Sequence, residues 1–544
     1  MYIEPNSNIK IYKNVPLDNT YNNTLYFSSL SEQNTYFHGS SSILKYNLTS
    51  QSYQRVVKGS MRVAIKSDNL YDCNYLAFQN ASFGTKWFYA FITSVEYVNN
   101  ETSEITFEID VMQTYLFDVT LKMSFVEREH SSTDVAGDNI VNENLDVGDY
   151  FYGLRVRSGL FNDYTIAMYY PYEMVGSTAT KKYKPQVICN NPSAISGIYF
   201  KGNTVDEALN SLEAVLFSLD QQGFSSDIAS IYCIPSSFVN STETIWNYLP
   251  SDVVEIDVTY ASNKPTTLGD YTPRNKKLLT YPYNMFVITT FDGDEKNYAY
   301  EYFSSDDITF KIQGNLTSNP SFKAVPLHYK GLNNNIAEGV VLSDLPLVPY
   351  TYNAYSQWYA QNKTRLGLQG LSGIAGGYNG IGEVTRGMNM LTPKTGVISS
   401  KGAKHIGKGV SNIVESGAST LLSGVTECIS ARTLGSKPVG STDGSLEIAT
   451  GTKDFSYMQK HINEKYAEII DDYFDMFGYA TRRIKIPNRN VRPHWTYTKT
   501  IGCNLQGNAP VDDVEKICSI YDNGITFWNN PSEVGDYSLD NTLA

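Results

Sequence analysis

Closely spaced carboxylates are the residues of this sequence that come nearest to a catalytic arrangement. Glu108 and Asp110 lie in the segment FEIDVMQ, and Glu127 and Glu129 lie in FVEREH. Two carboxyl groups can supply the acid and the base of glycoside hydrolysis. Because side chains two residues apart in a strand share a face, we expect each pair to project from one face. A polar strand edge at the surface or at an interface explains the same residues, and we favour that interpretation.

Histidine and cysteine spacings do not indicate a metal site. The six histidines are at positions 38, 130, 328, 405, 461 and 494, and they form no HExxH or His-x-His motif. The six cysteines are at positions 73, 189, 233, 428, 503 and 518, without close pairs, and we expect free thiols. The prediction is therefore a protein that is not an enzyme, with no catalytic residue, no cofactor and no bound metal.

A basic cluster without any intervening acid lies near the end of the chain. Its members are Arg482, Arg483, Lys485, Arg489, Arg492 and Lys499. Such a cluster suits contact with DNA, contact with acidic neighbouring subunits, or ion pairs on the chain's own surface. The formal charge of the whole chain is −13, which argues against general binding of nucleic-acid phosphates.

A glycine-rich, apolar stretch, GLQGLSGIAGGYNGIG, occupies residues 367–382. It lacks the Lys-Ser/Thr ending of a phosphate-binding loop, and no strand leads into it as in a dinucleotide-binding fingerprint. Each interior glycine costs a helix roughly 0.5 to 1 kcal/mol relative to alanine, so this stretch should not hold one conformation alone in water. The glycines that provide this freedom are Gly367, Gly370, Gly373, Gly376, Gly377, Gly380 and Gly382.

Apolar residues continue through this region and recur with helical period between positions 406 and 429. We predict that they contact a membrane. The set is Leu368, Leu371, Ile374, Ile381, Met388, Met390, Leu391, Ile406, Val410, Ile413, Val414, Leu421, Leu422 and Val425. As a helix, positions 406–429 would extend about 36 Å, comparable to a bilayer hydrocarbon core of about 30 Å. Two glutamates there exclude an ordinary lone spanning helix, but several copies in a ring could face a water channel.

Basic residues without an acid among them lie between the two apolar pieces, and we expect them to contact anionic lipid headgroups. They are Arg386, Lys394, Lys401, Lys404 and Lys408. A flexible linker or an ordinary buried helix pair explains the composition of the region equally well. Composition alone leaves these alternatives open.

Positions 1–128 and 276–348 alternate aromatic and β-branched residues with polar ones, as in MRVAIKS and DITFKIQG. This period of two predicts strands, and VNNETSE after Val98 predicts a hairpin turn. Between these regions, TIAMYY, PQVIC and SDIASIYCIP predict strands around one helix, which together make an inserted β-β-α-β module.

Three helices are predicted. The first runs from Val205 to about Gln221, and its apolar stripe is Val205, Leu209, Leu212, Leu216 and Leu219. The second runs over 454–477 and ends at Gly478, and the third runs over about 511–521.

These patterns divide the 544 residues into five parts. They are a first β domain (1–128), an inserted α+β middle domain (129–275), a second β domain (276–350), the glycine-rich apolar region (351–453) and a C-terminal α+β part (454–544). The N-terminus, MYIEPNSNIKIYKNV, lacks the features of a secretory signal, and we expect synthesis in a bacterial cytoplasm.

Several segments together resemble one family of viral proteins. They are VPLDNTYNNTLYF, NYLAFQN, KWFYAFITSVEYVN, EITFEIDVMQTYLFDVTLKMSFVEREH, KKLLTYPYNMF, YSQWYAQNK, RPHWTYTKT and YDNGITFW, in this order along the chain. The sequence resembles the tail knob, or distal tail tube, proteins of small short-tailed phages with protein-primed DNA replication. The glycine-rich stretch directly follows YSQWYAQNK, which is its place in that family.

The resemblance implies a mainly β fold with α+β insertions, in which β-barrel-like tube domains of six copies form a hollow cylinder. It implies that loops of the 351–453 region plug the tube and penetrate the host cytoplasmic membrane, whose lipids they contact. Other partners would be upper tail collar, tip or spike proteins. Double-stranded viral DNA would pass through the lumen without sequence-specific binding. The protein would reside in the virion, and a host cell-wall adhesin or a wall-degrading tail protein is the alternative.

Overall fold

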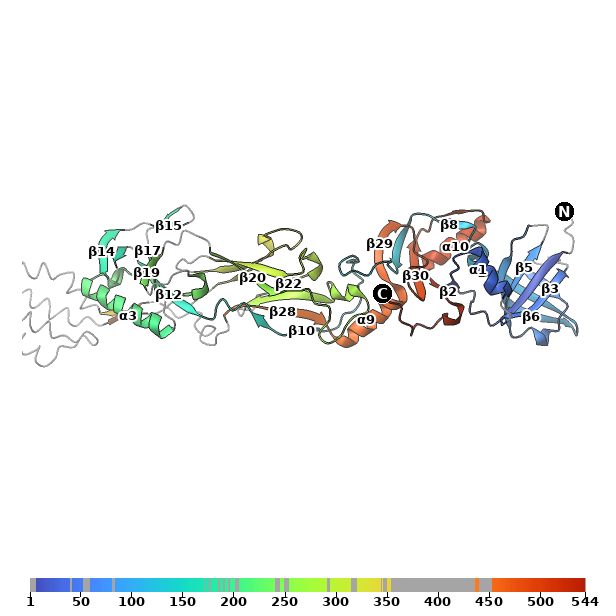
Figure 1. The fold of residues 1–544 in the computed structure, drawn as a ribbon, viewed down its shortest axis with the longest axis horizontal. Helices are drawn as coiled ribbons and strands as arrows, with labels where there is room; N and C mark the ends of the chain where they lie inside the picture. The colour runs from blue at the N-terminus through green and yellow to red at the C-terminus, as the bar shows by residue number, and fades with distance from the viewer. Residues whose placement is uncertain are drawn as a thin grey trace, which may run out of the picture.

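The computed structural model describes residues 6–39, 42–51, 59–80, 84–170, 172–175, 178–183, 186–188, 191–193, 196–200, 205–239, 245–248, 254–290, 294–314, 320–343, 345, 350–353, 436–439 and 453–543. Its sheets lie in a row along the long axis of the molecule (Figure 1). The chain begins at one end of this row and reaches the opposite end near α3 (Val205–Gln222). It then returns, so that its C-terminus lies in the middle of the row.

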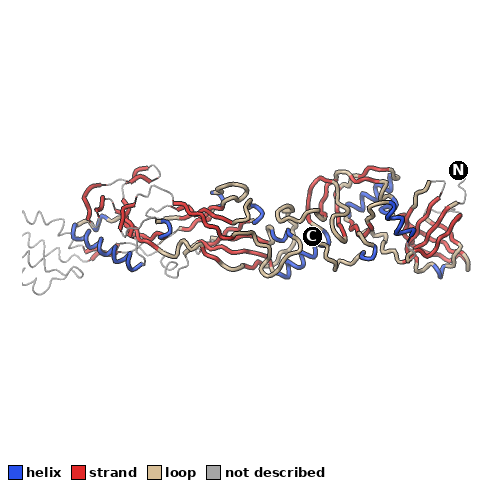
Figure 2. Tube along the Cα trace, viewed as in Figure 1, coloured by secondary structure: helices blue, strands red, loops and turns tan. Residues whose placement is uncertain are grey.

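Strands dominate the described part of the chain (Figure 2). The N-terminal sheet is antiparallel, in the order β3-β1-β5-β6-β7-β4. Its strands are β1 (Ser7–Lys13), β3 (Leu44–Gln51), β4 (Ser60–Val63), β5 (Cys73–Asn80), β6 (Phe88–Asn99) and β7 (Thr102–Ile109). Asn99 pairs with Thr102, which confirms the predicted hairpin.

The next sheet combines both ends of the chain, in the order β2-β32-β30-β9-β29. Its strands are β2 (Asn23–Leu25), β9 (Ser124–Glu129), β29 (Tyr479–Lys485), β30 (Trp495–Ile501) and β32 (Ile525–Trp528). Helices α1 (Leu30–Asn34), α2 (Val111–Thr114) and α10 (Val511–Asn523) and the pair β8 (Val119–Leu121) and β31 (Leu505–Gly507) complete this region. The rings of Trp495 and Trp528 lie 5.0 Å apart in a core that also contains Tyr12 and Tyr75.

Two further sheets pack face to face in the middle of the molecule. One contains β10 (Tyr150–Tyr152), β28 (Phe455–Ile462), β21 (Asn284–Thr290) and β22 (Glu295–Tyr298), with β11 (Val156–Arg157) also paired to β28. The other contains β20 (Val254–Ala261), β23 (Ile308–Gly314), β24 (Phe322–Pro326) and β25 (Val340–Leu342). Their shared core includes the stacked rings of Phe286 and Phe310, 5.5 Å apart.

The helix predicted over 454–477 is wrong in its first half. Residues Phe455–Ile462 form β28, and only Glu464–Phe477 form a helix, α9, which ends at Gly478 as predicted. The Asn463 side chain accepts a hydrogen bond from the backbone N–H of Lys465 and so begins the helix at that point. Because Phe455–His461 of β28 pair with β21, which is distant in sequence, tertiary pairing decides the conformation of this segment.

The sheet near the far end has the order β18-β12-β17-β19 and is covered on one face by α3. Its strands are β12 (Tyr164–Tyr170), β17 (Ser196–Phe200), β18 (Ser230–Pro235) and β19 (Ile245–Tyr248). The structure contains more strands in this region than the predicted β-β-α-β module. The pair β13 (Tyr172–Val175) and β14 (Thr178–Tyr183) is one addition, and β15 (Gln186–Ile188) pairs with β16 (Asn191–Ser193) instead of joining the sheet.

Helix α3 itself is confirmed, and so are Leu212, Leu216 and Leu219 of the predicted apolar stripe, which pack in the core beneath the helix. Ala208, Leu212, Val215 and Leu219 are buried against the sheet, whereas Leu209 is 40% exposed. Leu209 is therefore the member of the predicted stripe that faces away from the sheet, and Ala208 lies on the buried side.

Strands β26 (Tyr350–Asn353) and β27 (Ser436–Val439) form an antiparallel pair, and β26 lies against α3. Remaining short helices are Thr35–Gly39, Ser67–Asn69, Ser225–Asp227, Ser236–Phe238, Lys276–Leu279, Tyr300–Tyr302, Ile336–Glu338 and Pro531–Glu533. Asn353 pairs with Ser436, so the 82 residues from 354 to 435 begin and end at one point.

Candidate functional site: a polar junction and an apolar sheet face

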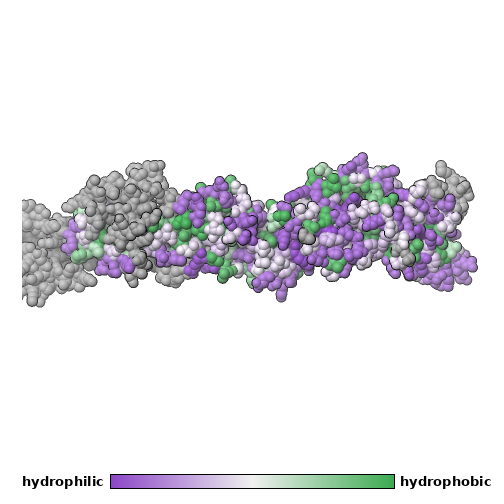
Figure 3. Space-filling model, viewed as in Figure 1, coloured by the Kyte–Doolittle hydropathy of each residue, from purple (hydrophilic) through white to green (hydrophobic). Residues whose placement is uncertain are grey.

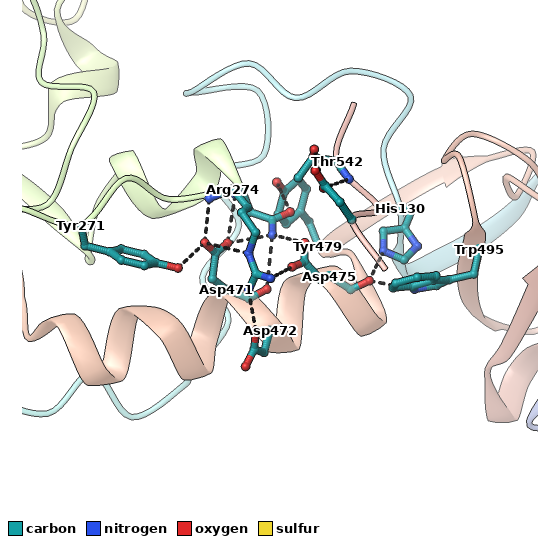
Figure 4. A network of polar contacts seen from close by, with 11 residues as sticks. His130, Tyr271, Arg274, Asp471, Asp472, Asp475, Tyr479, Trp495 and Thr542 are labelled. Carbon is teal, nitrogen blue, oxygen red and sulfur yellow. Dashed lines mark hydrogen bonds and ion pairs between the residues drawn. The ribbon is translucent and has the colours of Figure 1, made fainter. Parts of the chain in front are cut away.

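A buried carboxylate on α9 organises the junction between the middle sheets and the sheet of β29 (Figure 4). The side chain of Asp471 is fully buried. It accepts hydrogen bonds from the backbone N–H groups of Arg274 and Asn275, at 2.7 and 2.9 Å, and from the Tyr271 hydroxyl at 2.8 Å. The Asn275 amide also donates to it, at 2.8 Å. These bonds hold the segment that contains residues 271–275 against the helix.

The next turn of α9 places a second carboxylate in the same network. Asp475 accepts from the Asn275 amide at 2.6 Å and lies 3.1 Å from the Arg274 guanidinium. Burial raises the pKa of Asp475 to about 6. Its backbone carbonyl accepts from the Trp495 indole at 2.9 Å, so the network extends into the next sheet (Figure 4).

His130 joins the strand β9 region to the same helix end. Its Nδ1 accepts from the Tyr497 backbone N–H at 2.8 Å, and its Nε2 donates to the Asp475 carbonyl at 3.0 Å. Burial, and then the positive charge of Arg492, lower the pKa of His130 to about 3. The imidazole is therefore neutral and has a defined tautomer.

Glu143 provides a third buried carboxylate at this junction. It pairs with the Arg128 guanidinium and the Lys277 ammonium, and it accepts from the Ala480 backbone N–H at 2.9 Å. Burial lowers the pKa of Lys277 despite the nearby Glu143 charge. These contacts connect three stretches of chain that are distant in sequence, which makes the junction a structural centre.

An exposed apolar face lies on the sheet next to this junction. Ile484 of β29 and Ile501 of β30 both pair with Phe125 of β9, so the three side chains project from one face. Ile484 is 70% exposed, and Met123 and Ile486, which directly flank β9 and β29, are also exposed. We call Met123, Phe125, Ile484, Ile486 and Ile501 the apolar sheet face. Figure 3 shows apolar surface over this part of the molecule.

Two family models of phage tail proteins match segments of this chain. The model for the C-terminal domain of the tail knob protein gp9 of Bacillus phage phi29 matches residues 247–542, more than half of the chain. The chain belongs to this tail knob family. A second model, the N-terminus of the caudoviral major tail protein, matches residues 5–120. The protein is thus a structural tail component of a short-tailed phage and resides in the virion.

Individual relatives match the chain over nearly its whole length. The tail knob protein gp9 of Bacillus phage phi29 is 24% identical, and that of Bacillus phage B103 is 25% identical. Each match covers 99% of this chain and 98% of the relative. The solved structure of the bacteriophage C1 tail knob protein gp12 has a TM-score of 0.63 and 14% identity, and covers 98% of this chain and 99% of that chain. The resemblance identified from the sequence is confirmed.

We predicted that each carboxylate pair, Glu108 with Asp110 and Glu127 with Glu129, projects from one face of a strand. The structure shows that neither pair does. Asp110 leaves the strand and caps α2, whereas Glu108 pairs with Lys516. The Glu127 side chain is 38% exposed and that of Glu129 only 1%, because a β-bulge at this point of β9 interrupts the alternation.

Several members of the basic cluster make contacts within the chain. Lys485 pairs with Glu129, Lys499 lies 2.8 Å from Glu127, and Arg483 donates to the Asp138 carbonyl at 3.2 Å. Arg492 is buried, and its Nε and Nη2 have no protein partner. Of the alternatives given for the basic cluster, ion pairs within the chain's own surface apply to Lys485 and Lys499.

The glycines, membrane-contacting residues and basic residues predicted between positions 367 and 425 lie outside the described residues. Within the described ranges, no helix is long and apolar enough to cross a membrane. The same part of the chain has no group of three or more His, Cys, Asp and Glu side chains suited to hold a metal ion.

Sequence reasoning missed the polar junction and the apolar sheet face. The spacing of Asp471 and Asp475 on one face of α9, with Tyr271 and Arg274 as distant partners, was the available signal for the junction. For the apolar sheet face, the alternation in RRIKIP placed Ile484 and Ile486 on one side. Neither pattern identifies its distant partner.

Asp471→Asn tests the junction. The amide replaces an acceptor oxygen with a donor that faces existing donors, so we expect a loss of about 3 kcal/mol of local stability. Hydrogen exchange at the Arg274 and Asn275 amides should accelerate by about two orders of magnitude. Asp472→Asn is the matched control, because it removes only an exposed ion pair with Arg274, in which the Asp472 side chain is 68% exposed. Equal exchange rates in both variants would contradict a central role for Asp471.

His130→Gln tests the opposed titrations at this junction. In the unfolded chain His130 binds a proton below about pH 6.5, whereas in the folded protein its pKa is about 3 and it stays neutral. Acidification between these values therefore destabilises the fold. The pKa of Asp475 is about 6 in the folded protein and 3.8 ordinarily. Its protonation therefore stabilises the fold on acidification. Without His130, stability relative to the unsubstituted chain should rise by about 2 kcal/mol between pH 7 and 5. Urea unfolding at each pH measures this difference, and parallel pH profiles would contradict it.

Proposed function

We propose that this tail knob protein forms the distal tail tube as a homohexamer, conducts double-stranded DNA during ejection and inserts the 354–435 segment into the host cytoplasmic membrane. The observation that carries the proposal is the pairing of β26 with β27 beside α3. This pair holds both ends of the segment at the end of the molecule opposite the N-terminal sheet (Figure 1).

The composition of the anchored segment supports a membrane role. Between residues 367 and 391 the only charges are Glu383 and Arg386, among seven glycines at the start and several large apolar side chains. The basic residues that follow, from Lys394 to Lys408, contrast with a chain of formal charge −13. Anionic headgroups attract such a local excess of positive charge. Loops held at one end of a tube, with glycine freedom and apolar side chains, suit both a plug and a penetrating element.

Charge supports the role of the assembled tube as a conduit. Six copies would carry 6 × (−13) = −78 formal charges. A conduit of the same sign as DNA does not hold the phosphate backbone, so the DNA slides instead of adhering. The tube would join other tail proteins at its N-terminal end, where the segment 5–120 matches the caudoviral major tail protein model.

Contact between neighbouring copies is supported by the apolar sheet face. It includes Ile484 of β29, which is the edge strand of its sheet. Exposed apolar side chains beside an open edge mark a surface that another chain covers. A closed ring of copies would cover six such surfaces at once.

Dye release from liposomes tests the membrane role. We expect the full chain to release dye from anionic vesicles, and a chain without residues 367–430 to release little, because the β26–β27 pair remains but the apolar residues are gone. Vesicles of neutral lipid and measurements at neutral and mildly acidic pH serve as controls. If both chains leak equally, or neither leaks, the membrane role is wrong while the tube could remain.

Ile484→Asp tests the assembly. A charge in the apolar sheet face should shift the protein from hexamer toward monomer, because the carboxylate would lose its hydration in the interface. Ile469→Asp on α9 is the matched control, since Ile469 is 65% exposed and lies outside that face. Sedimentation velocity distinguishes the species. A hexamer in both variants would contradict the assigned surface.

A further inference from the structure

Two cysteines that are 15 positions apart in sequence meet beside α10. Cys503 lies in the turn between β30 and β31, and Cys518 lies on α10. The backbone N–H of Cys503 donates to the Asp522 carboxylate at 3.0 Å, and the Thr500 hydroxyl donates to the same oxygen at 2.7 Å. Asp522 follows Cys518 by one helical turn, so both project from the face of α10 that meets this turn.

The two side chains lie near enough for each thiol to affect the pKa of the other, and both residues are partly accessible to solvent. Among the described cysteines, Cys73 is instead buried in the core of the N-terminal sheet, and Cys233 lies on β18 in the far sheet. Gly502 precedes Cys503 with a positive φ of 68°, and a Cβ there would meet nothing within 4 Å. The glycine gives the backbone of this turn the conformational freedom to adjust when a disulfide forms.

We propose that Cys503 and Cys518 form a redox-responsive dithiol site, which closes into an intramolecular disulfide by exchange with a small-molecule disulfide. One cysteine thiolate attacks the oxidant, forms a mixed disulfide and releases one small thiol. The second thiolate attacks the protein sulfur of that mixed disulfide and releases the other small thiol. The protein loses two thiol hydrogens, and the oxidant is reduced to two thiols.

The environment of the site determines the rate and the direction of this exchange. Burial raises the pKa of Cys503 to about 12 and also raises that of Cys518, so the thiolate fraction is small and the reaction is slow at neutral pH. A virion component meets the oxidising medium outside cells, which favours the disulfide. The site depends on the fold alone, and not on the proposed membrane or conduit role.

Closure of the site would fix α10 to the end of β30. Helix α10 contributes Ile517, Ile520 and Tyr521 to the core shared by the N-terminal and C-terminal segments. A disulfide between positions 503 and 518 closes a short loop that includes the first half of α10, and it restricts the unfolded chain in that loop. The expected consequence is slower opening of α10 in the oxidised protein.

Treatment of the full chain with oxidised glutathione tests the site. After alkylation and digestion, mass spectrometry should find a peptide cross-linked between Cys503 and Cys518, which a reducing agent abolishes. Closure should accelerate as pH rises from 7 to 9. Amide exchange in α10 should slow by roughly tenfold in the oxidised protein. Cys518→Ser should prevent the cross-link, and Cys233→Ser, at a distant strand, should leave it unchanged.

Two results would overturn the proposal. One is that the folded chain gives only unreacted thiols or mixed disulfides with glutathione at positions 503 and 518. The other is that the cross-link forms only after unfolding in urea. If the cross-link forms in the folded chain and α10 exchanges at its former rate, the clamping of α10 is wrong. The first measurement uses the unsubstituted chain, so it does not depend on how either variant folds.

Discussion

The hydrogen bonds of one buried carboxylate, Asp471, constrain the arrangement of the whole junction. A charged group without water costs several kcal/mol unless every oxygen has strong donors. Here the donors are two backbone N–H groups, a tyrosine hydroxyl and an asparagine amide, all from residues 271–275. The helix and this distant segment must therefore adopt their positions together. A shift of either one leaves a buried charge with unsatisfied oxygens.

This constraint matters because the chain follows the long axis of the molecule and then returns. Segments from opposite ends of the sequence meet twice along that path. At the junction, α9 lies between the middle sheets and the sheet of β29, and Glu143 and His130 add contacts from a third segment. Further along, Trp495 and Trp528 pack with Tyr12 and Tyr75 in one core. The tail knob protein is therefore held together by cores that combine early and late parts of its chain.

The same topology brings together the two described strands that flank positions 354–435. The chain leaves and returns through β26 and β27, whose pairing beside α3 completes a local unit. A long insertion of this kind costs little in loop-closure entropy, because the cost rises only slowly with length. Such an insertion is thus compatible with the proposed membrane role. This agrees with a segment rich in glycine and poor in charge.

Local patterns in the sequence were sufficient for most strands, for α3 and for α10. In each of these, alternation or helical period coincides with the face that is buried, as in β7 and β23. The pattern failed where a distant partner decides the conformation. Residues Phe455–Ile462 continue into a helix by local preference, but hydrogen bonds to β21 make them a strand. On α3 the exception is Leu209, which is exposed because the face toward the sheet passes through Ala208 instead.

The sequence by itself determined the family, the mainly β class and the unusual composition of residues 367–430, since these depend on residue order and local period alone. Only the tertiary structure decided the rest. The buried partners of Asp471, the apolar face formed by Phe125, Ile484 and Ile501, and the meeting of Cys503 with Cys518 belong to that second group. Each depends on which strand or helix lies beside which. That choice minimises the exposed apolar surface and the unpaired polar groups of the whole chain, and no local window contains this information.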